Sequence, residues 1–404
     1  MRVANDPQAR RVRAVLNKEL DPTQPGNQVG RLDADLRRSV VGQDEAIHQV
    51  VNHYQTYLSG LSSPGRPIAN FLFLGPTGCG KTLLVEAMAE SLVGRAQAVI
   101  KIDCAEFQHS HEIAKLVGSP PGYLGHRDTH PLFSQEVLES RQTESVKLNF
   151  VLFDEIEKAS DALWNLLLGI LDKATLTTGD NRVVDFSRSM IFMTSNLGAA
   201  QMSSILDPGV GFVSSEIRRR RFSGAMDETL NERLGRAAVE AARRKFTPEF
   251  MNRIDKTIVF KPLGETALRQ VLGLELNIVQ KRILSSLCKE AFVFSLTEPA
   301  KDFLLREGTD TQYGARHLKR AIERHLVHPL SNLIGSGQVS AGDLIEVDLD
   351  PAKSKLAFFR VAEGLPRYVM AQMADKPLAE PPASASASAV AGRSRALSVR
   401  SFRR

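Results

Sequence analysis

Short, dense apolar runs recur in the first two thirds of the chain. They are FLFLG at 71–75, AVIKID at 98–103, FVLFD at 150–154 and SMIFMTS at 189–195. Runs of this length without polar alternation are typical of strands buried on both faces of a parallel sheet. Residues 81–93 and 161–173, which lie between them, have helical character. The alternation of strand and helix predicts an α/β domain with a parallel sheet between helical layers, joined by right-handed crossovers.

The pattern changes after Lys261-Pro262. Residues 265–291 and 298–334 are expected to be helical, and 342–350 with 355–362 are expected to form a strand pair. This pattern predicts a smaller, mostly helical C-terminal domain. The chain then divides into an N-terminal extension, a large α/β domain, the small domain and a disordered basic tail, at residues 1–30, 31–260, 261–362 and 363–404.

The two ends of the chain lack the signs of a packed core. Residues 1–30 show no sustained periodicity and contain Asp21-Pro22 and Pro25-Gly26. The last residues run through PLAEPPASASASAV into an arginine-bearing stretch, a composition that cannot bury enough apolar surface to fold. We therefore expect a loose lead-in and a disordered tail.

Composition narrows the class of protein without naming its function. Of the 404 residues, 43% are hydrophobic and 24% are charged, as in ordinary globular proteins, which excludes wholesale disorder and a collagen-like fibre. No apolar run approaches the ~18 residues of a membrane-spanning helix, and no secretory signal is recognisable. The cysteines, Cys79, Cys104 and Cys288, are too scattered for a disulfide framework or a zinc site. These features favour a cytoplasmic protein with no membrane partner.

The net charge of +6 raises the possibility of a nucleic-acid partner. The charge lies at the ends, because residues 1–30 carry +2 and residues 376–404 carry +5, which leaves −1 for the body. Basic ends can contact nucleic acid or a membrane surface, but such ends are more often solvated tails. The distribution therefore does not favour nucleic acid.

A phosphate-binding loop follows the first apolar run. GPTGCGKT at 75–82 fits G-x-x-x-x-G-K-[ST], with a strand before it and a helix after it. Its glycines allow backbone N–H groups to surround phosphate oxygens, Lys81 can reach the β- and γ-phosphates, and the Thr82 hydroxyl can bind Mg²⁺. The predicted cofactors are ATP and Mg²⁺. The predicted loop residues are Gly75, Pro76, Thr77, Gly78, Cys79, Gly80, Lys81, Thr82 and Leu83.

Two carboxylates follow the third apolar run, in VLFDEIEK at 151–158. Ligands of open α/β sheets bind at the carboxyl ends of the strands, where these side chains are expected to lie. Asp154 is expected to hold Mg²⁺ through water. Glu155 is expected to orient and polarise the attacking water as a general base. Adjacent carboxylates alone are usually a solvated strand end, and it is their pairing with the phosphate loop that points to ATP hydrolysis.

Further motifs occur in a recognisable order. They are VVGQDEAI at 40–47, TSN at 194–196, FTPEFMNRID at 246–255 and YGARHLKRAI at 313–322. Together with the two nucleotide motifs, they make residues 31–350 strongly resemble the Clp family of AAA+ unfoldases. The closest match is the second ATPase module of the ClpB, ClpA and ClpC type, here in a chain with one such module.

The resemblance assigns roles to single residues. It implies that Val41 and Gly42 line the adenine pocket and that Asn196 senses the γ-phosphate or the attacking water. Arg253 matches the arginine finger that reaches the nucleotide of a neighbouring subunit, and Arg316 matches the sensor arginine of the small domain. Arginines suit these roles because the transition state spreads negative charge over the γ-phosphoryl oxygens. Each arginine taken alone would more often be a surface ion pair.

A loop rich in glycine and proline lies at 116–130 and carries one aromatic residue, Tyr123. Gly122, Tyr123, Leu124 and Gly125 resemble the pore loop of Clp unfoldases, which implies a homo-hexamer whose channel grips protein substrates. A tyrosine packed on its own domain is the alternative. The following HRDTH departs from the family pattern, and its two histidines lack the companions of a metal site.

Residues 197–245 form an enlarged insert with the run Arg218–Arg221. Val210, Gly211 and Phe212 resemble the tripeptide that docks the peptidase ClpP, but three residues are a weak match, and an ordinary loop anchor is the favoured interpretation.

Three functions remain open at this stage. The first is a ring-forming ATPase that unfolds or remodels proteins by threading them through an axial pore. The second is an AAA+ remodeller of one dedicated assembly, such as a secretion sheath or a nucleic-acid complex, or the ATPase subunit of a ClpP-like protease. The third is a scaffold that uses nucleotide only structurally, which the full set of predicted catalytic residues argues against.

Overall fold

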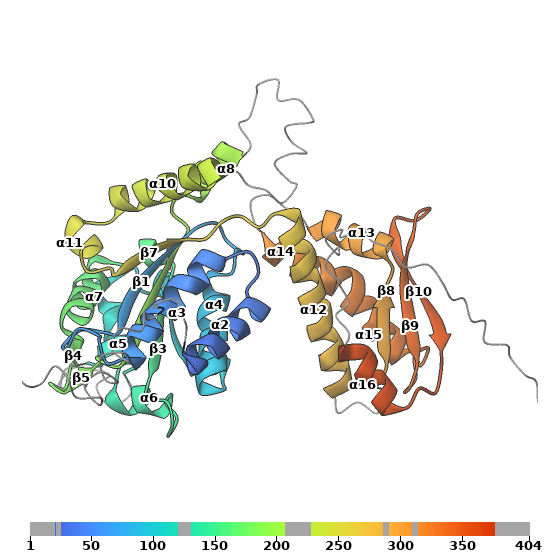
Figure 1. The fold of residues 1–404 in the computed structure, drawn as a ribbon, viewed down its shortest axis with the longest axis horizontal. Coiled ribbons are helices and arrows are strands. Elements are labelled where there is room, and N and C mark those ends of the chain that lie inside the picture. Colours follow the sequence, from blue (N-terminus) through green and yellow to red (C-terminus); the bar gives the residue numbers. More distant parts are fainter. Residues whose placement is uncertain are drawn as a thin grey trace, which may run out of the picture.

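The computed structural model describes residues 21, 26–119, 131–206, 228–285, 291–308 and 314–375. They form a large layered unit and a smaller C-terminal unit, joined where the chain leaves β7 (Lys256–Val259) and enters α12 (Glu265–Ser285) (Figure 1). The α/β fold with a parallel sheet, predicted from the apolar runs, is confirmed.

The large unit is built on a five-stranded parallel sheet in the order β2-β3-β6-β1-β7. The four predicted apolar runs form its inner strands and one edge, and the other edge strand is β7. The four strands that match these runs are β1 (Ala69–Leu74), β2 (Val99–Asp103), β3 (Asn149–Asp154) and β6 (Ser189–Ser195).

The residues of the inner strand β1 alternate between the two faces of the sheet. Phe71 and Phe73 of β1 pack into one core, whereas Leu72 and Leu74 pack into the other, because side chains alternate along a strand. Both faces are covered, so all six residues of β1 are buried. The uniform burial explains why β1 reads as a continuous apolar run.

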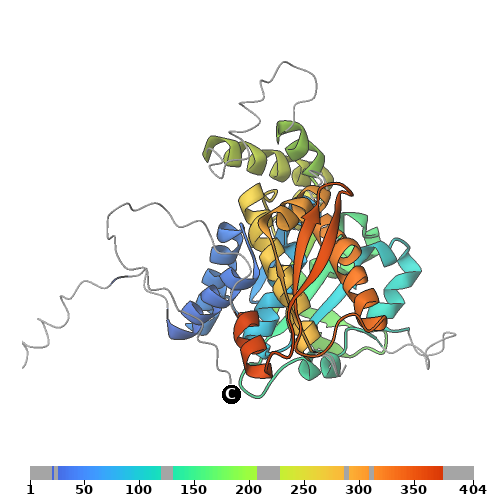
Figure 2. The ribbon, with the colours of Figure 1, turned by 90° about the vertical axis from the view of Figure 1, so that its right-hand side faces the viewer.

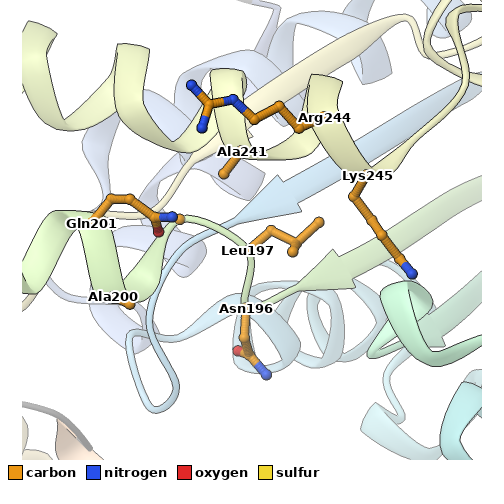
Figure 3. A pocket seen from close by; sticks show the side chains of 8 residues that line it. Asn196, Leu197, Ala200, Gln201, Ala241, Arg244 and Lys245 are labelled. Carbon is orange, nitrogen blue, oxygen red and sulfur yellow. The ribbon is translucent and has the colours of Figure 1, made fainter.

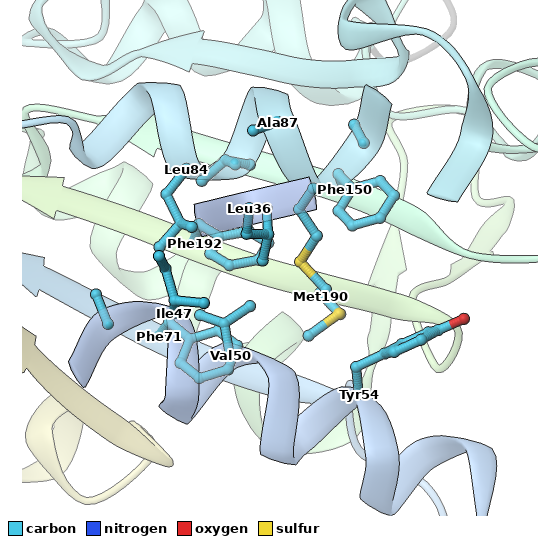
Figure 4. Packing of buried hydrophobic residues seen from close by; sticks show 14 of the residues in the cluster. Leu36, Ile47, Val50, Tyr54, Phe71, Leu84, Ala87, Phe150, Met190 and Phe192 are labelled. Carbon is cyan, nitrogen blue, oxygen red and sulfur yellow. The ribbon is translucent and has the colours of Figure 1, made fainter. Parts of the chain in front are cut away.

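Helices α2 (Asn27–Ser39), α3 (Asp44–Leu58) and α4 (Lys81–Val93) cover the first face of the sheet. Figure 4 shows Leu36, Val50 and Leu84 of these helices packed over Phe71 and Phe192. The Phe71 and Phe192 rings stack with centroids 5.2 Å apart. Helix α2 begins inside the lead-in expected to be loose, because Val29 and Leu32 are buried in this core.

Helices α7 (Asp161–Lys173) and α10 (Glu228–Lys245) cover the second face of the sheet. Helix α10 lies beside α8 (Ala199–Leu206) at one end of the molecule (Figures 1 and 2). The shorter elements are α5 (Ala114–Val117), α6 (Gln135–Ser140), β4 (Thr175–Thr177), β5 (Val183–Asp185) and α11 (Pro248–Met251).

The small unit packs helices against a three-stranded sheet, β10-β9-β8. The predicted strand pair is confirmed as antiparallel β9 (Leu344–Asp350) and β10 (Lys355–Ala362), and β8 (Val293–Leu296) adds a parallel third strand. The predicted helical stretch 298–334 consists of α13 (Glu298–Gly308), α14 (Ala315–Ile322), a π-helical turn (Glu323–Val327) and α15 (His328–Gly335).

One expectation about the C-terminal segment is wrong. Residues 363–404 were expected to be disordered, yet Arg367–Asp375 form helix α16. Met370 is 2% exposed and packs with Ala291 and Val293, which provides the apolar contact that anchors the helix. None of the helices in the described part of the chain has the length and apolar character needed to cross a membrane.

Candidate nucleotide site

The phosphate loop connects β1 to α4 at the carboxyl edge of the sheet. At Gly75 the backbone has a φ of 146°, and a side chain there would place its Cβ 2.5 Å from the carbonyl oxygen of Phe260. Only glycine fits this position. Helix α4 begins at Lys81, so its free N–H groups and positive dipole end point into the loop, an arrangement suited to bind phosphate.

Lys81 lies inside the loop with 8% of its surface exposed. Its Nζ donates hydrogen bonds to the carbonyl oxygens of Gly75 at 2.7 Å and Pro76 at 3.0 Å, and to Asn196 Oδ1 at 3.0 Å. Burial lowers the pKa of Lys81, and the negative charges of Asp154 and Glu157 oppose that shift. The three hydrogen-bond partners of Lys81 are uncharged oxygens, and a phosphate anion would supply the negative charge that favours the ammonium form.

The predicted sensor Asn196 joins the loop to the acidic strand end. Its Oδ1 accepts hydrogen bonds from Lys81 and from Thr77 Oγ1, the latter at 3.3 Å, and its Nδ2 donates to Glu155 Oε1 at 3.4 Å. The structure therefore brings together three residues predicted from separate motifs: Lys81, Asn196 and Glu155.

Thr194 connects the two acidic residues. Its hydroxyl donates to Asp154 Oδ1 and accepts the backbone N–H of Glu155 at 3.2 Å. Glu155 adopts a left-handed backbone conformation with a φ of 54°, which is uncommon for a residue with a side chain and costs energy. The Thr194 hydroxyl thus bonds to the residue expected to hold Mg²⁺ and to the backbone of the expected base.

Two neighbours of the acidic pair complete this cluster. Lys158 Nζ lies 2.5 Å from Glu155 Oε2, and that hydrogen bond raises the pKa of Lys158. Glu157 Oε1 accepts the backbone N–H of Asn196 at 3.1 Å. Glu155 is therefore held between a cation and the sensor amide.

The small unit contacts the phosphate loop directly. The backbone N–H of Ala315 donates to the carbonyl oxygen of Gly78 at 3.2 Å, at the start of α14. Arg316 lies one residue further along α14, and its positive charge lowers the pKa of Lys81, behind burial as the larger cause. The structure therefore places Arg316 on the same side as the phosphate loop, as the resemblance implies.

The segment expected to line the adenine pocket lies where the two units meet. A Cβ on Gly42 would lie 3.5 Å from side-chain atoms of Leu263 and Ala267. The adjacent Gln43 is buried, and its amide donates to the carbonyl oxygens of Cys79 at 3.1 Å and Lys261 at 2.9 Å. Val41 precedes this pair and is half-buried.

Arg253 is not part of this cluster. Its carbonyl oxygen bonds to Asn70, which lies near the amino end of β1, whereas the phosphate loop follows the carboxyl end. At 3.3 Å per residue, Asn70 and Gly75 are about 16 Å apart along the strand. The side chain of Arg253 is too short to span that distance, so Arg253 does not serve the phosphate loop of its own chain.

A pocket of about 430 Å³ opens beside Asn196, between the end of β6 and helices α8 and α10. Figure 3 shows that Leu197 lies between Asn196 and helix α10, which carries Arg244 and Lys245. The pocket therefore lies next to Asn196, the predicted sensor residue.

The residues present fit a bound Mg²⁺ that relies mainly on nucleotide oxygens and water. Thr82 and Asp154 supply one hydroxyl and one carboxylate, and Mg²⁺ bound with phosphates typically takes few protein ligands. In the described ranges no group of three or more histidine, cysteine or acidic residues forms a metal cage.

Several predicted residues lie outside the described ranges. They are the loop residues Gly122, Tyr123, Leu124 and Gly125, and the tripeptide Val210, Gly211 and Phe212. Their roles stay predictions.

Sequence reasoning missed three residues of the site. Thr194, Glu157 and Gln43 each make hydrogen bonds that hold a predicted residue or its loop. Each of the three lies inside a motif quoted above and close to a residue with an assigned role, and this proximity was the only sequence feature that could have pointed to it. Their roles depend on contacts between strands and loops distant in sequence, which no local pattern reveals.

Two family models match successive parts of the chain. The model described as AAA domain (Cdc48 subfamily) matches residues 66–257, and the model of the C-terminal, D2-small domain of ClpB protein matches residues 263–347. These ranges fall within the large and small units of the fold.

Individual relatives agree with these matches. The ClpB chaperone of Bdellovibrio bacteriovorus is 40% identical over 78% of this chain, and that of Meiothermus ruber is 38% identical over 80%. The ATP-binding subunit ClpC of the Clp protease from Staphylococcus saprophyticus is 36% identical over 80%. The match covers 33%, 34% and 37% of these relatives, so this chain spans about a third of their length.

A solved structure extends the similarity to three dimensions. A closed state of Hsp104 with ATPγS and FITC casein superimposes with a TM-score of 0.67 and 27% identity, covering 87% of this chain and 55% of that one. The features described above agree with this structural similarity: they are the phosphate loop, the acidic strand end, Asn196 and the small domain that matches the D2-small model. The chain belongs to the Clp family of AAA+ ATPases.

Proposed function

We propose that this chain forms a homo-hexameric ring that uses ATP hydrolysis to unfold or remodel proteins by drawing them through an axial pore. One observation carries the proposal. Lys81, Asn196 and Glu155 form one cluster, whereas Arg253 is anchored at the opposite edge of the sheet. Arg253 of the same chain cannot complete this cluster, so we infer that Arg253 of a neighbouring subunit does, which makes hydrolysis depend on assembly.

The residues of the cluster divide the work of hydrolysis. Lys81 exchanges its carbonyl partners for phosphate oxygens when ATP binds. Glu155 accepts a proton from the attacking water, and Asn196 orients that water or the γ-phosphate. Arg253 of the neighbouring subunit stabilises the charge that develops on the γ-phosphoryl oxygens.

Thr82 and Asp154 would hold Mg²⁺, which neutralises charge on the β- and γ-phosphates when bound. Arg316 would report nucleotide state to the small unit, because α14 already contacts the phosphate loop. The segment between β7 and α12 is the hinge through which the two units change their relative angle.

The proposed substrates are polypeptides, which Tyr123 would grip by steric contact. This part rests on the resemblance of residues 122–125 to a pore loop, together with the family relationship. A cytoplasmic location fits the relatives and the cysteine content. Docking of a ClpP-like peptidase through residues 210–212 stays a weaker prediction, because it depends on three residues alone.

Substitution of Tyr123 tests the coupling of hydrolysis to unfolding. We expect Tyr123→Ala to hydrolyse ATP at close to the wild-type rate but to unfold a tagged fluorescent protein at less than about a tenth of it, because an alanine lacks the bulk to hold an extended chain. The loss of fluorescence under single-turnover conditions gives the unfolding rate.

The matched control is Tyr123→Phe, which keeps the aromatic ring and should retain most of the unfolding rate. A wild-type unfolding rate in Tyr123→Ala would disprove the threading mechanism. An assembled wild-type ring without ATP turnover would instead favour a scaffold that uses nucleotide only structurally.

A further inference from the structure

Asn70 is a buried polar residue in β1, an inner strand of the large sheet. It is 0% exposed and stands between Ala69 and Phe71 in a strand that is otherwise apolar. Burial of an amide among apolar groups is unfavourable unless hydrogen bonds compensate for the lost water. The nucleotide site does not use this residue, because it lies at the other end of the strand.

The hydrogen bonds of Asn70 converge on one short segment. Its Nδ2 donates to the carbonyl oxygens of Arg253 and Leu171, both at 3.0 Å. Its backbone N–H donates to Asp255 Oδ2 at 2.7 Å, and its carbonyl oxygen accepts the N–H of Asp255 at 2.9 Å. Three of these four bonds fix the main chain or side chains of residues 253–255.

The side-chain orientation of Asn70 follows from its partners. Both hydrogens of Nδ2 are donated to carbonyl oxygens, so the amide group acts here as a hydrogen-bond donor. Its Oδ1 is buried and has no partner among the described residues. An apolar residue would avoid that cost, but it would leave the carbonyl oxygens of Arg253 and Leu171 without the two bonds that the amide donates.

Helix α7 holds the other end of Arg253. The carbonyl oxygen of Leu171, in the last turn of α7, accepts a hydrogen bond from the same Asn70 amide. The next residue is Asp172, whose Oδ2 lies 3.9 Å from Arg253 Nη2. Glu249 Oε1 lies 3.1 Å from the same nitrogen. The main chain of Arg253 is thus anchored in the sheet. Its side chain is 22% exposed, its Nη2 is paired with exposed carboxylates, and its Nη1 is buried without a partner among the described residues.

We propose that Asn70 is a positioning residue for Arg253, and that it acts by fixing the main chain from which the arginine reaches the neighbouring nucleotide. The inference rests on the proposed trans role of Arg253. A group that stabilises a transition state must be held within about 0.5 Å of its productive position by a rigid element. Strand β1 meets this need, because it carries the phosphate loop at one end and the arginine anchor at the other.

Two substitutions remove the donors step by step. Asn70→Val suits a strand and has no donor, so both carbonyl oxygens lose their partner. Asn70→Thr is close to asparagine in size and keeps one donor. The controls are Asn149→Val and Asn149→Thr. Asn149 is 2% exposed at the amino end of β3, another inner strand of the same sheet, and its Oδ1 accepts a hydrogen bond from Gln142 instead.

We expect Asn70→Val to lower kcat for ATP about tenfold to a hundredfold, because small displacements of a catalytic group have effects of that size. KM for ATP should stay within about twofold, since the phosphate loop is untouched. Asn70→Thr should lie between Asn70→Val and wild type. Each variant should lose no more thermal stability than its Asn149 control. If Asn70→Val does not fold, Asn70→Thr and Asn149→Thr carry the same comparison.

A double substitution separates positioning from general damage. In the Arg253→Ala background, Asn70→Thr should lower kcat no further, because the group that it positions is gone. A kcat of Asn70→Thr equal to that of Asn149→Thr, or a full additional loss in the Arg253→Ala background, would overturn the positioning role alone. Wild-type kcat in Arg253→Ala itself would overturn the proposed trans role, and this inference with it.

Discussion

Single residues of the nucleotide site act through partners that are distant in sequence. Thr194 shows this most directly, because one buried hydroxyl bonds both to the Asp154 carboxylate and to the backbone N–H of Glu155. Glu155 needs such support, since its backbone occupies the left-handed region. A residue held in an unfavourable conformation persists only where its surroundings determine it.

Removal of the Thr194 hydroxyl tests this support. We expect Thr194→Val, which keeps the branched shape, to lower kcat for ATP about tenfold to a hundredfold, because Asp154 and Glu155 lose a shared partner. Steady-state ATPase assays with a thermal unfolding control provide the measurement. Thr194→Ser keeps the hydroxyl and should retain most activity, and a wild-type kcat in Thr194→Val would show that the bridge is dispensable.

Single elements were predicted unequally well. The strands buried on both faces and helices 81–93 and 161–173 were predicted within a residue or two, because their signal is local and repeated. Ala291, the expected end of the first helix of the small domain, is not helical, and α16 occupies part of the expected tail. Both differences lie where the small unit supplies the packing, through Ala291, Val293 and Met370.

The N-terminus of α14 is the element that links the small unit to the phosphate loop. Gly314 has a φ of 54°, and a Cβ there would lie 3.0 Å from the carbonyl oxygen of Gly78 and 3.1 Å from that of Thr77. The close approach and the positive φ both favour glycine. This contact brings Arg316 to the nucleotide side.

Gly314→Ala should therefore move α14 away from the loop and weaken ATP binding. Strain of about 1–3 kcal/mol corresponds to a rise in Kd of roughly 5- to 150-fold. Titration of a fluorescent ATP analogue measures it. Gly335→Ala is the matched control, since a Cβ at Gly335 meets nothing within 4 Å. Equal affinities of the two variants would disprove the role of this contact.

At the scale of the whole molecule, the proposed function implies that each subunit presents an incomplete site. The phosphate loop lies at the carboxyl edge of the sheet and Arg253 at the amino edge, so a single chain cannot join them. A heterologous ring, in which each subunit contacts its neighbour through different faces, brings these two edges together.

Mixed assemblies test this geometry. Lys81→Ala subunits should lack nucleotide binding, and Arg253→Ala subunits should lack hydrolysis, so each alone should be nearly inactive. After random mixing, about a quarter of the sites combine an intact phosphate loop with an intact arginine, and about that share of wild-type turnover should return. A mixture no more active than its components, with assembly confirmed by light scattering, would rule out arginine supplied in trans.

The sequence by itself determined the α/β class, the phosphate loop, the acidic strand end and the family. These features depend on short apolar runs and motifs whose residues are close along the chain. Tertiary structure alone decided that Lys81, Asn196 and Glu155 meet, that Thr194 bridges Asp154 and Glu155, and that Asn70 holds Arg253 at the far edge. The reason is physical: strand order β2-β3-β6-β1-β7 brings together residues over a hundred positions apart, and hydrogen bonds across such distances leave no periodic trace in sequence.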